Sequence, residues 1–251
     1  MSNRVALVTG GAQGIGQGIS ETLGANGFRV AVADLNLEAA EATAKRITDA
    51  GGEAIAVPVD VTDTESVRTA VKTVVAALGE IEIVVNNAGW DDFMPFLKTS
   101  EDFWDKILDI NFKGALRVIK AVVPGMMDRG FGRVINIGSD AGRVGSSLEA
   151  VYSGAKGGII AFTKTLAREI ATKGITVNTV CPGYIDTPWF TKGRGEAGAK
   201  QVRDSVIAKV PLKIASSADD IAQLVCFLAS PASSNMTGEI VRMDAGMHLI
   251  L

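Results

Sequence analysis

The segment Val5–Gly16 reads VALVTGGAQGIG and decides the fold of this chain. Its four leading apolar residues predict a buried strand, and the glycines that follow predict a tight turn into a helix over residues 16–26. Glycines let the backbone approach a ligand closely, and the start of a helix offers free N–H groups to an anion. The turn therefore predicts a site for the pyrophosphate of a dinucleotide, although its GxxxGxG spacing differs from the common GxGxxG fingerprint. The residues expected to bind there are Gly10, Gln13, Gly14, Ile15 and Gly16.

Beyond this turn, short apolar runs keep alternating with helical patterns. Further strands are expected over residues 29–34, 54–60, 81–86, 133–137, 176–181 and 239–243, and helices over 37–50, 64–78, 103–129, 150–173 and 219–228. Thr62 is a candidate N-cap for the helix that begins at Thr64. Near-continuous apolar strands between helices are typical of a parallel sheet covered on both faces. We therefore expect an α/β fold with a doubly wound, seven-stranded parallel sheet, in a single domain over residues 1–251.

The composition narrows the class of protein. The chain has 251 residues, 47% hydrophobic content and a net charge of −3, so nothing suggests nucleic acid or an anionic membrane as a partner. No apolar run is long enough to cross a bilayer, and the two cysteines form no CxxC pair, so we expect a cytoplasmic location. The one histidine, His248, lies near the C-terminus. We expect a surface or interface role for it, and neither a catalytic histidine nor a metal site.

Carboxylates follow the second and third expected strands. Asp34 ends the second strand, where a carboxylate can accept hydrogen bonds from ribose hydroxyls and would repel a 2′-phosphate. No basic residue stands at Gln13 or Leu35 to hold that phosphate, so the sequence favours NAD over NADP. Asp60 and Val61, after the third strand, are expected beside the adenine. The structural alternative for both aspartates is a turn or capping role.

Tyr152 and Lys156 lie four residues apart in an expected helix, so their side chains share a face. An ammonium about 4 Å from a phenol attracts the phenolate by roughly 4 kcal/mol at an effective dielectric of about 20. Such a charge lowers the pKa of the tyrosine toward neutrality, where it can exchange a proton with an alcohol or a carbonyl. Ordinary helices also contain the Tyr-x-x-x-Lys pattern. Here Ser139, thirteen residues before Tyr152, and the glycine turn favour a catalytic interpretation.

With these residues assembled, the chain resembles the classical short-chain dehydrogenase/reductase family over nearly its whole length. The resemblance rests on TGxxxGxG at residues 9–16, NNAG at residues 86–89, Asn111, Ser139, Tyr152, Lys156, Pro182 and Gly183. It implies a Rossmann-type fold and hydride transfer between a substrate carbon and a nicotinamide. It also implies a homotetramer, with residues 103–129 and 150–173 at the dimer face, and the apolar end Met247–Leu251 could enter a second interface.

The resemblance further implies a role for each matched residue. Ser139 would hydrogen-bond the substrate oxygen, and Tyr152 would exchange a proton with it. Lys156 would lower the pKa of the tyrosine and hold the nicotinamide ribose, and Asn111 would continue the proton relay. Tyr152 and Lys156 thereby also count as cofactor-binding residues. The remaining cofactor-binding residues that it implies are Asn87, Ala88, Gly89, Pro182, Gly183, Ile185 and Thr187.

The segments after Gly89, Ser139 and Gly183 line the substrate pocket of this architecture, the last as a lid at about residues 184–212. They carry Trp90, Phe93, Tyr184, Trp189 and Phe190, although the chain is only 6% aromatic. These rings favour a cyclic or aromatic substrate; alternatively, they pack the lid against the body. Three glycines within residues 193–198 predict a flexible lid tip. The cations Arg143, Lys192, Arg194, Lys200 and Arg203 could meet the phosphates of a coenzyme A thioester, or form a solvated surface.

Residues 86–91 and 139–147 are similar to a subgroup that includes 1-arylethanol dehydrogenases and 2-hydroxycyclohexanecarboxyl-CoA dehydrogenases. The main expectation is an NAD-dependent oxidoreductase that interconverts a hydrophobic aromatic or alicyclic secondary alcohol and its ketone, with Tyr152 as general acid and base. The alternatives are a hydroxyacyl-CoA dehydrogenase and a 3-ketoacyl carrier-protein reductase, which Asp34 disfavours. A non-catalytic dinucleotide sensor is disfavoured because Ser139, Tyr152 and Lys156 are all present.

Overall fold

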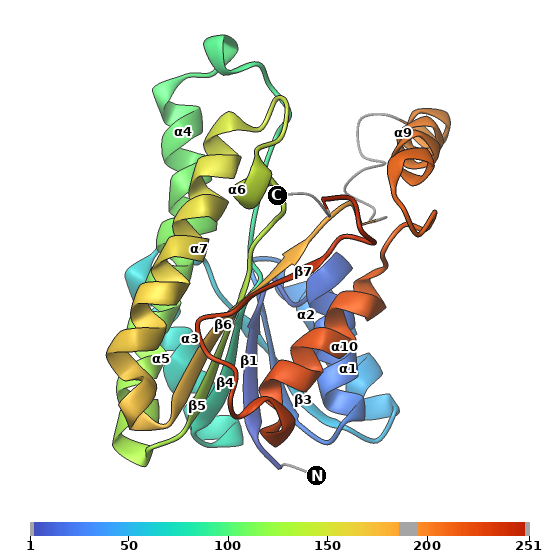
Figure 1. Cartoon of the computed structure of the whole chain (residues 1–251). Helices are drawn as coiled ribbons and strands as arrows, with labels where there is room; N and C mark the ends of the chain where they lie inside the picture. Colours follow the sequence, from blue (N-terminus) through green and yellow to red (C-terminus); the bar gives the residue numbers. More distant parts are fainter. Residues whose placement is uncertain (1–2, 186–194, 249–251) are drawn as a thin grey trace.

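A computed structural model describes residues 3–185 and 195–248, with one seven-stranded sheet between two layers of helices (Figure 1). The strands are β1 (Val5–Thr9), β2 (Arg29–Asp34), β3 (Glu53–Pro58), β4 (Ile81–Asn86), β5 (Gly132–Ile137), β6 (Ile175–Pro182) and β7 (Ile240–Met243). The α-helices are α1 (Gly14–Ala25), α2 (Leu37–Asp49), α3 (Thr64–Leu78), α4 (Glu101–Leu108), α5 (Gly114–Arg129), α6 (Ala141–Val144), α7 (Ala150–Ile170), α9 (Gly195–Lys209) and α10 (Ala218–Ala229). The expected α/β fold with a doubly wound sheet is confirmed.

The order of the strands creates a crevice at one end of the sheet. All neighbours pair in parallel, in the order β3-β2-β1-β4-β5-β6-β7. The order reverses between β1 and β4, so the chain leaves these two neighbouring strands toward opposite faces. Ligands of open α/β sheets bind at such a switch point, outside the carboxyl ends of the strands.

Two apolar cores hold the helices on the two faces of the sheet. One core packs α3, α5 and α7 against it through residues such as Val74, Met126 and Ile170. The other packs α1, α2 and α10 through residues such as Ile19, Ile47 and Val225. Figure 1 shows these two layers on either side of the sheet. Both faces of the strands are therefore buried, which explains their near-continuous apolar sequences.

The connection between β3 and α3 differs from the expectation in two details. β3 ends at Pro58, so Asp60 lies in the loop beyond it and not at the end of a strand. The prediction that Thr62 caps α3 is wrong, because Asp63 is the N-cap and accepts hydrogen bonds from the backbone N–H groups of Glu65 and Ser66. A carboxylate in this position satisfies two of the free N–H groups at a helix start.

The long helix expected over residues 103–129 is interrupted. A π-helical turn over Asp109–Lys113 separates α4 from α5 and contains the buried Asn111. Such turns are rare and occur mostly at functional sites, because the extra residue redirects a side chain out of the regular helical pattern. The π turn directs the amide of Asn111 to the loop after β4, where it meets the backbone of Trp90.

Helix α9 falls where a flexible tip was expected. Residues 195–198 belong to α9, which corrects that part of the prediction, because helix-forming residues such as Glu196, Ala197 and Gln201 outweigh the glycines. The short helix α6, after Ser139, was not expected from the sequence. Among the described residues, no helix combines the length and the apolar character that crossing a membrane requires.

Candidate functional site

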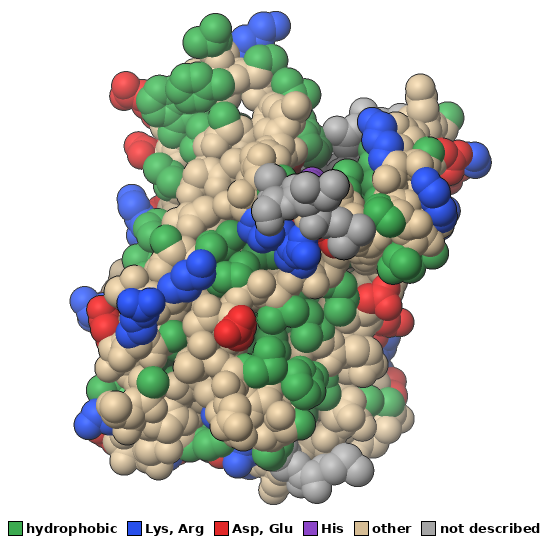
Figure 2. Space-filling model, in the orientation of Figure 1, with side chains coloured by type: hydrophobic (Ala, Val, Ile, Leu, Met, Phe, Trp, Pro, Cys, Tyr) green, Lys and Arg blue, Asp and Glu red, His purple; other side chains and the backbone are tan. Residues whose placement is uncertain are grey.

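A cleft of about 1560 Å³ opens at the carboxyl ends of the strands. Figure 2 shows this end hollowed between the part that carries α4 and α6 and the part that carries α9. The predicted residues that line the cleft are Gly10, Gln13, Gly14, Ile15, Gly16, Asp34, Asp60, Val61, Asn87, Ala88, Gly89, Trp90, Phe93, Ser139, Tyr152, Lys156, Pro182, Gly183, Tyr184 and Ile185. The structure thus brings together residues from six separate connections after strands.

Some predicted residues do not line the cleft or cannot be placed. Asn111 is buried behind the wall of the cleft, and Arg143 is not part of its lining. Thr187, Trp189 and Phe190 lie outside the described residues, as do the lid cations at positions 192 and 194. The expectations for these residues stay predictions.

The turn after β1 requires glycine at several positions, because of its backbone conformation or because a Cβ would clash with a neighbour. Gly10 and Gly14 have positive φ angles of 61° and 56°. A Cβ on Gly16 would lie 2.0 Å from the carbonyl oxygen of Gly10, which no real side chain tolerates. Helix α1 then begins without a side-chain cap and without an acidic residue in its first turn. Its free N–H groups and positive dipole end therefore fit a pyrophosphate.

Asp34 stands at the end of β2 beside this turn. Its Oδ2 accepts a hydrogen bond from the backbone N–H of Ala12 at 3.1 Å, and its Oδ1 accepts one from the N–H of Asn36 at 3.0 Å. Asp34 therefore has the structural role in a turn that the sequence left open as an alternative to ribose binding. Asp34 and Leu35 also line the cleft, and Lys106 and Lys156 are the only lysines or arginines among the described lining residues. The Asp34 end of the described lining thus carries no cation for a 2′-phosphate.

The loop after β4 is fastened to the glycine turn by Asn87. Its Nδ2 donates to the carbonyl oxygens of Thr9 and Gly10 at 3.1 and 2.9 Å. The backbone N–H groups of Asn87 and Ala88 donate in return to Oγ1 of Thr9. These four hydrogen bonds join the connections after β1 and β4 at the switch point.

Ser139, Tyr152 and Lys156 meet on the other side of the cleft. Ser139 follows β5, while Tyr152 and Lys156 lie one helical turn apart near the start of α7. The hydroxyls of Ser139 and Tyr152 hydrogen-bond each other. Nζ of Lys156 donates to the carbonyl oxygen of Ile137 at 2.9 Å and lies 5.6 Å from the centre of the tyrosine ring. A substrate oxygen placed between the two hydroxyls would contact both a donor and a proton-exchanging group.

The sequence predicted a lowered pKa for Tyr152, but in the structure its pKa is raised. Burial raises the pKa of Tyr152 above its ordinary value, and the negative charges of Glu149 and Asp91 raise it further, while the bond to Ser139 lowers it. Burial also lowers the pKa of Lys156 to about 8. In the chain by itself Tyr152 is therefore a protonated donor, as reduction of a carbonyl requires. The positive charge of an oxidised nicotinamide ring would favour tyrosinate for the reverse direction.

The buried amide of Asn111 hydrogen-bonds the backbone behind the wall of the cleft. Its Nδ2 donates to the carbonyl oxygens of Trp90 and Ile107, and its Oδ1 accepts from the N–H of Trp90 at 3.2 Å. A Cβ on Gly89 would lie 2.9 Å from this Oδ1 and 3.7 Å from Nζ of Lys156, so the amide and the ammonium flank the same glycine.

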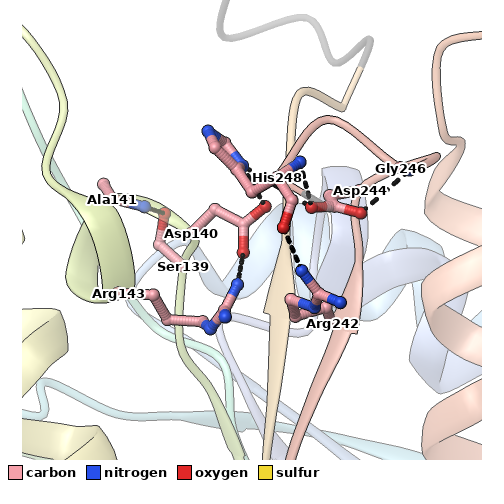
Figure 3. Close-up of polar contacts among 8 residues, drawn as sticks. All are labelled: Ser139, Asp140, Ala141, Arg143, Arg242, Asp244, Gly246 and His248. Atoms are coloured by element: carbon pink, nitrogen blue, oxygen red, sulfur yellow. Dashed lines mark hydrogen bonds and ion pairs between the residues drawn. The ribbon is translucent and has the colours of Figure 1, made fainter. Parts of the chain in front are cut away.

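A second polar cluster lies next to Ser139 and joins it to the end of the chain (Figure 3). Asp140 Oδ2 contacts Nδ1 of His248 at 3.1 Å, and Asp140 Oδ1 accepts from Arg143 at 3.2 Å. Asp244 accepts from the backbone N–H groups of Gly246 and His248. The ligand atoms of Asp140, Asp244 and His248 lie within 4.8 Å of one another, but all are engaged in these hydrogen bonds. The cluster therefore acts as an internal fastening of the Ser139 loop.

The same cluster bears on the expectation for Arg143. This arginine has one-fifth of its side chain exposed and pairs with the buried Asp140, so its charge is used within the protein. His248 also lines the cleft, which no sequence pattern indicated. Asp91 and Glu149 lie in the segments that were expected to line the pocket, although neither was singled out, and both line the cleft with Tyr152.

Known proteins are similar to this chain over nearly its whole length. A family model described as "Enoyl-(Acyl carrier protein) reductase" matches residues 10–248. The 3-oxoacyl-[acyl-carrier-protein] reductase FabG of Salmonella typhimurium is 38% identical over 248 residues, which are 98% of this chain and 98% of that protein. The acetoacetyl-CoA reductase of Cupriavidus necator is 38% identical over 250 residues, which are 99% of this chain and 100% of that protein.

One solved structure is also similar to this chain over its whole length. The crystal structure of gox2181 matches with a TM-score of 0.93 and 36% sequence identity, covering 100% of this chain and 97% of that one. These two curated relatives are named as reductases of 3-oxoacyl or acetoacetyl groups, and not as dehydrogenases of 1-arylethanols. The chain therefore belongs to the short-chain dehydrogenase/reductase family of oxidoreductases.

Proposed function

We propose that this protein interconverts 3-oxoacyl and 3-hydroxyacyl thioesters, using a nicotinamide dinucleotide. The observation that carries the proposal is the full-length similarity to enzymes named as reductases of 3-oxoacyl-[acyl-carrier-protein] and acetoacetyl-CoA. The sequence analysis gave thioester substrates as alternatives to its main expectation, a secondary alcohol that is not bound to a thioester. The relatives favour the thioester substrates.

The residues of the cleft supply the chemistry that this reaction needs. The dinucleotide, when bound along the glycine turn and Asp34, supplies or accepts the hydride at the substrate carbon. Ser139 hydrogen-bonds the reacting oxygen and orients it. Tyr152 donates its phenolic proton to that oxygen as the carbonyl becomes an alcohol, and removes it in the reverse direction. Lys156 and Asn111 restore the proton on Tyr152 from the solvent side.

NAD is the proposed cofactor because of Asp34. A carboxylate beside the ribose position accepts hydrogen bonds from two hydroxyls and repels a 2′-phosphate. The cations of the described cleft lining, Lys106 and Lys156, come from α4 and α7, and neither stands beside Asp34. Comparison of kcat/KM for NADH and NADPH tests this, and a higher value for NADPH would contradict it.

The second candidate is a free aromatic or alicyclic secondary alcohol. Trp90, Phe93 and Tyr184 line the cleft, and the pairing of Arg143 with Asp140 occupies one of the cations that could anchor a coenzyme A phosphate. The ring of Trp90 is, however, turned to α4, where Nζ of Lys106 lies 3.6 Å from its centre and Phe103 packs against its edge. The ring therefore serves partly as packing, as the sequence left open.

The test is a comparison of substrates at one pH. Acetoacetyl-CoA and its 3-hydroxy product would be compared with acetophenone, 1-phenylethanol and cyclohexanol, in both directions with NAD(H). We expect kcat/KM to be at least about 10-fold higher for the thioesters. Higher values for the free aryl or alicyclic alcohols would overturn the proposal and make the second candidate the answer.

We further propose a cytoplasmic homotetramer, as expected from the sequence. Both cysteines are unpaired, which suits a reducing compartment. Molar mass by light scattering tests the assembly, and a stable monomer would contradict it.

A further inference from the structure

His248 is the one histidine of the chain, and the proposed chemistry does not use it. The sequence led us to expect a surface or interface role, yet the residue lines the cleft with 26% of its side chain exposed. Its Nδ1 lies 3.1 Å from Oδ2 of Asp140, the residue after Ser139. Because Asp140 is only 4% exposed, this contact is made inside the protein. Such a contact beside a proposed catalytic side chain can control where that side chain lies.

The hydroxyl of Ser139 is held by its own loop. Its Oγ accepts from the backbone N–H of Ala141 at 3.1 Å, and Asp140 stands between these two residues (Figure 3). The backbone N–H of Asp140 donates to the carbonyl oxygen of Pro182 at 3.0 Å, which fixes one side of the loop. A displacement of Asp140 would therefore move both Ser139 and the N–H group that orients its hydroxyl.

The side chain of Asp140 has one partner near in sequence and one remote. Arg143 pairs with Oδ1 at 3.2 Å and belongs to α6, so it comes from the same connection as Asp140. His248 stands 108 residues away and comes from the segment after β7. A carboxylate offers only acceptors, so Nδ1 of His248 donates to Oδ2. Of these two partners, only His248 joins the loop to another part of the fold.

The segment that carries His248 is itself fixed. Asp244, directly after β7, accepts from the backbone N–H groups of Gly246 and His248 at 3.0 and 3.1 Å. The N–H of Leu212, which follows α9, donates to the carbonyl oxygen of Ala245 at 3.3 Å. Ala245 has a φ of +52°, which a residue with a side chain keeps only where its surroundings impose it. The segment thus gives His248 a defined position, from which its ring can fix a neighbouring loop.

We propose that His248 is a positioning residue, which acts through Asp140 to place the hydroxyl of Ser139 against the reacting oxygen. The inference rests on the proposed function only for the role of Ser139, and it goes beyond it by giving the segment after β7 a part in the reaction. Rates depend steeply on geometry, since a misplacement of about 1 Å can lower a rate about 100-fold. Loss of the contact should therefore affect the chemical step more than the binding of the cofactor.

His248→Leu and His248→Asn separate the hydrogen bond from the bulk of the side chain. Leucine offers no donor, whereas the amide of asparagine places a donor near the position of Nδ1. With acetoacetyl-CoA and NADH, His248→Leu should lower kcat about 10-fold, and His248→Asn should restore it to within about 3-fold of wild type. The Kd for NADH should stay within about 2-fold of wild type in both variants. An equal loss of kcat in the two variants would overturn the role of the hydrogen bond.

A double-mutant cycle tests whether His248 acts through Ser139. In the Ser139→Ala background the hydroxyl is absent, so adding His248→Leu should change kcat by less than about 2-fold. A further loss as large as that in wild type would show that His248 acts elsewhere, and would overturn the proposal. A general loss of stability does not produce the expected pattern, because it lowers activity in both backgrounds alike.

Ile47→Val is the control for a change in stability alone. Ile47 is 3% exposed in the core beside α2 and does not line the cleft, so this variant should lower the melting temperature and leave kcat unchanged. Thermal unfolding and NADH binding of each variant show whether it is folded. If His248→Leu does not fold, His248→Gln takes its place, because a glutamine donor reaches the position of Nε2 and misses Asp140.

The failures of the two proposals are distinguishable. The test of His248 compares kcat between variants and needs only one ketone that wild type reduces. If wild type prefers aryl ketones to acetoacetyl-CoA, the proposed function fails, and the cycle is run with the better ketone. A loss of kcat that disappears in the Ser139→Ala background supports the role of His248 with either substrate, and an additive loss overturns it.

Discussion

The two sides of the cleft are built in different ways. On the cofactor side, Gly10, Gly14 and Gly16 form one short turn, and Asn87 fastens it with side-chain to backbone hydrogen bonds. On the substrate side, Asp91 and Glu149 come from loops 58 residues apart in the sequence, joined through the strained Leu148. The proposed cofactor side thus offers backbone N–H groups and the carboxylate of Asp34. The proposed substrate side offers ionisable side chains that come from separate loops.

The two kinds of contact differ in how much substitution they tolerate. A backbone cradle binds any pyrophosphate and tolerates little change, because each glycine is required by its conformation or by contact with a neighbour. Side chains in loops can be exchanged without altering the sheet. Tyr152 and Lys156 lie between the two sides, and their chemistry depends on both.

Tyr152→Phe is expected to have the largest effect on activity. It separates proton transfer from cofactor binding, and so tests whether the two sides of the cleft act independently. Loss of the phenolic proton donor should lower kcat by about 10³-fold, within the usual range for a general acid. NADH binding, measured by fluorescence titration, should stay nearly unchanged. Near-normal turnover would remove the proton-transfer role from Tyr152.

Gly16→Ala tests the cofactor side alone. A Cβ here meets the carbonyl oxygen of Gly10, so the turn must shift at a cost of about 1–3 kcal/mol. NADH affinity should fall about 10- to 100-fold, and the melting temperature should fall with it. Gly154→Ala is the matched control, because nothing lies within 4 Å of a Cβ there. Equal NADH affinity in Gly16→Ala and Gly154→Ala would contradict the proposal that the glycine turn binds the cofactor.

Asp34→Ala asks whether the cofactor side contains any selective side chain. Removing the carboxylate should narrow the preference for NADH over NADPH by about 10-fold, since charged hydrogen bonds to the ribose are lost and repulsion of a 2′-phosphate is relieved. The ratio of kcat/KM for the two cofactors is the measurement. A ratio equal to that of wild type would mean that another group sets the preference.

The smallest effect concerns stability and the substrate side. The pKa of Asp91 is about 8 in the folded chain and near 3.8 when unfolded, so the folded state keeps a proton that the unfolded state releases. The stability of wild type relative to Asp91→Asn should therefore fall as the pH rises from about 4 to about 8, and level off above. The difference in melting temperature between the two should shift by about 4 °C or more from pH 5 to pH 8. A difference that stays constant with pH would show that Asp91 is ionised throughout.

Much of this protein could be predicted because its signals are local. The strand, glycine turn and helix of Val5–Gly16 lie within twelve residues, and hydrophobic periodicity is a property of short segments. The sheet and the placement of Ser139, Tyr152 and Lys156 at one cleft followed from such segments. The cap at Asp63, the π turn around Asn111 and helix α9 did not, because element ends depend on contacts that neighbouring residues compete to make.

The sequence by itself determined the fold, the glycine turn and the residues that we propose exchange the proton, because each is encoded by spacing along the chain. Only the tertiary structure decided the state of the charged groups. It paired Arg143 with Asp140, brought His248 to the Ser139 loop, and placed Asp91 against Glu149 beside Tyr152. The physical reason is that a pKa or an ion pair depends on burial and on distances between residues remote in sequence, and these exist only once the chain has folded.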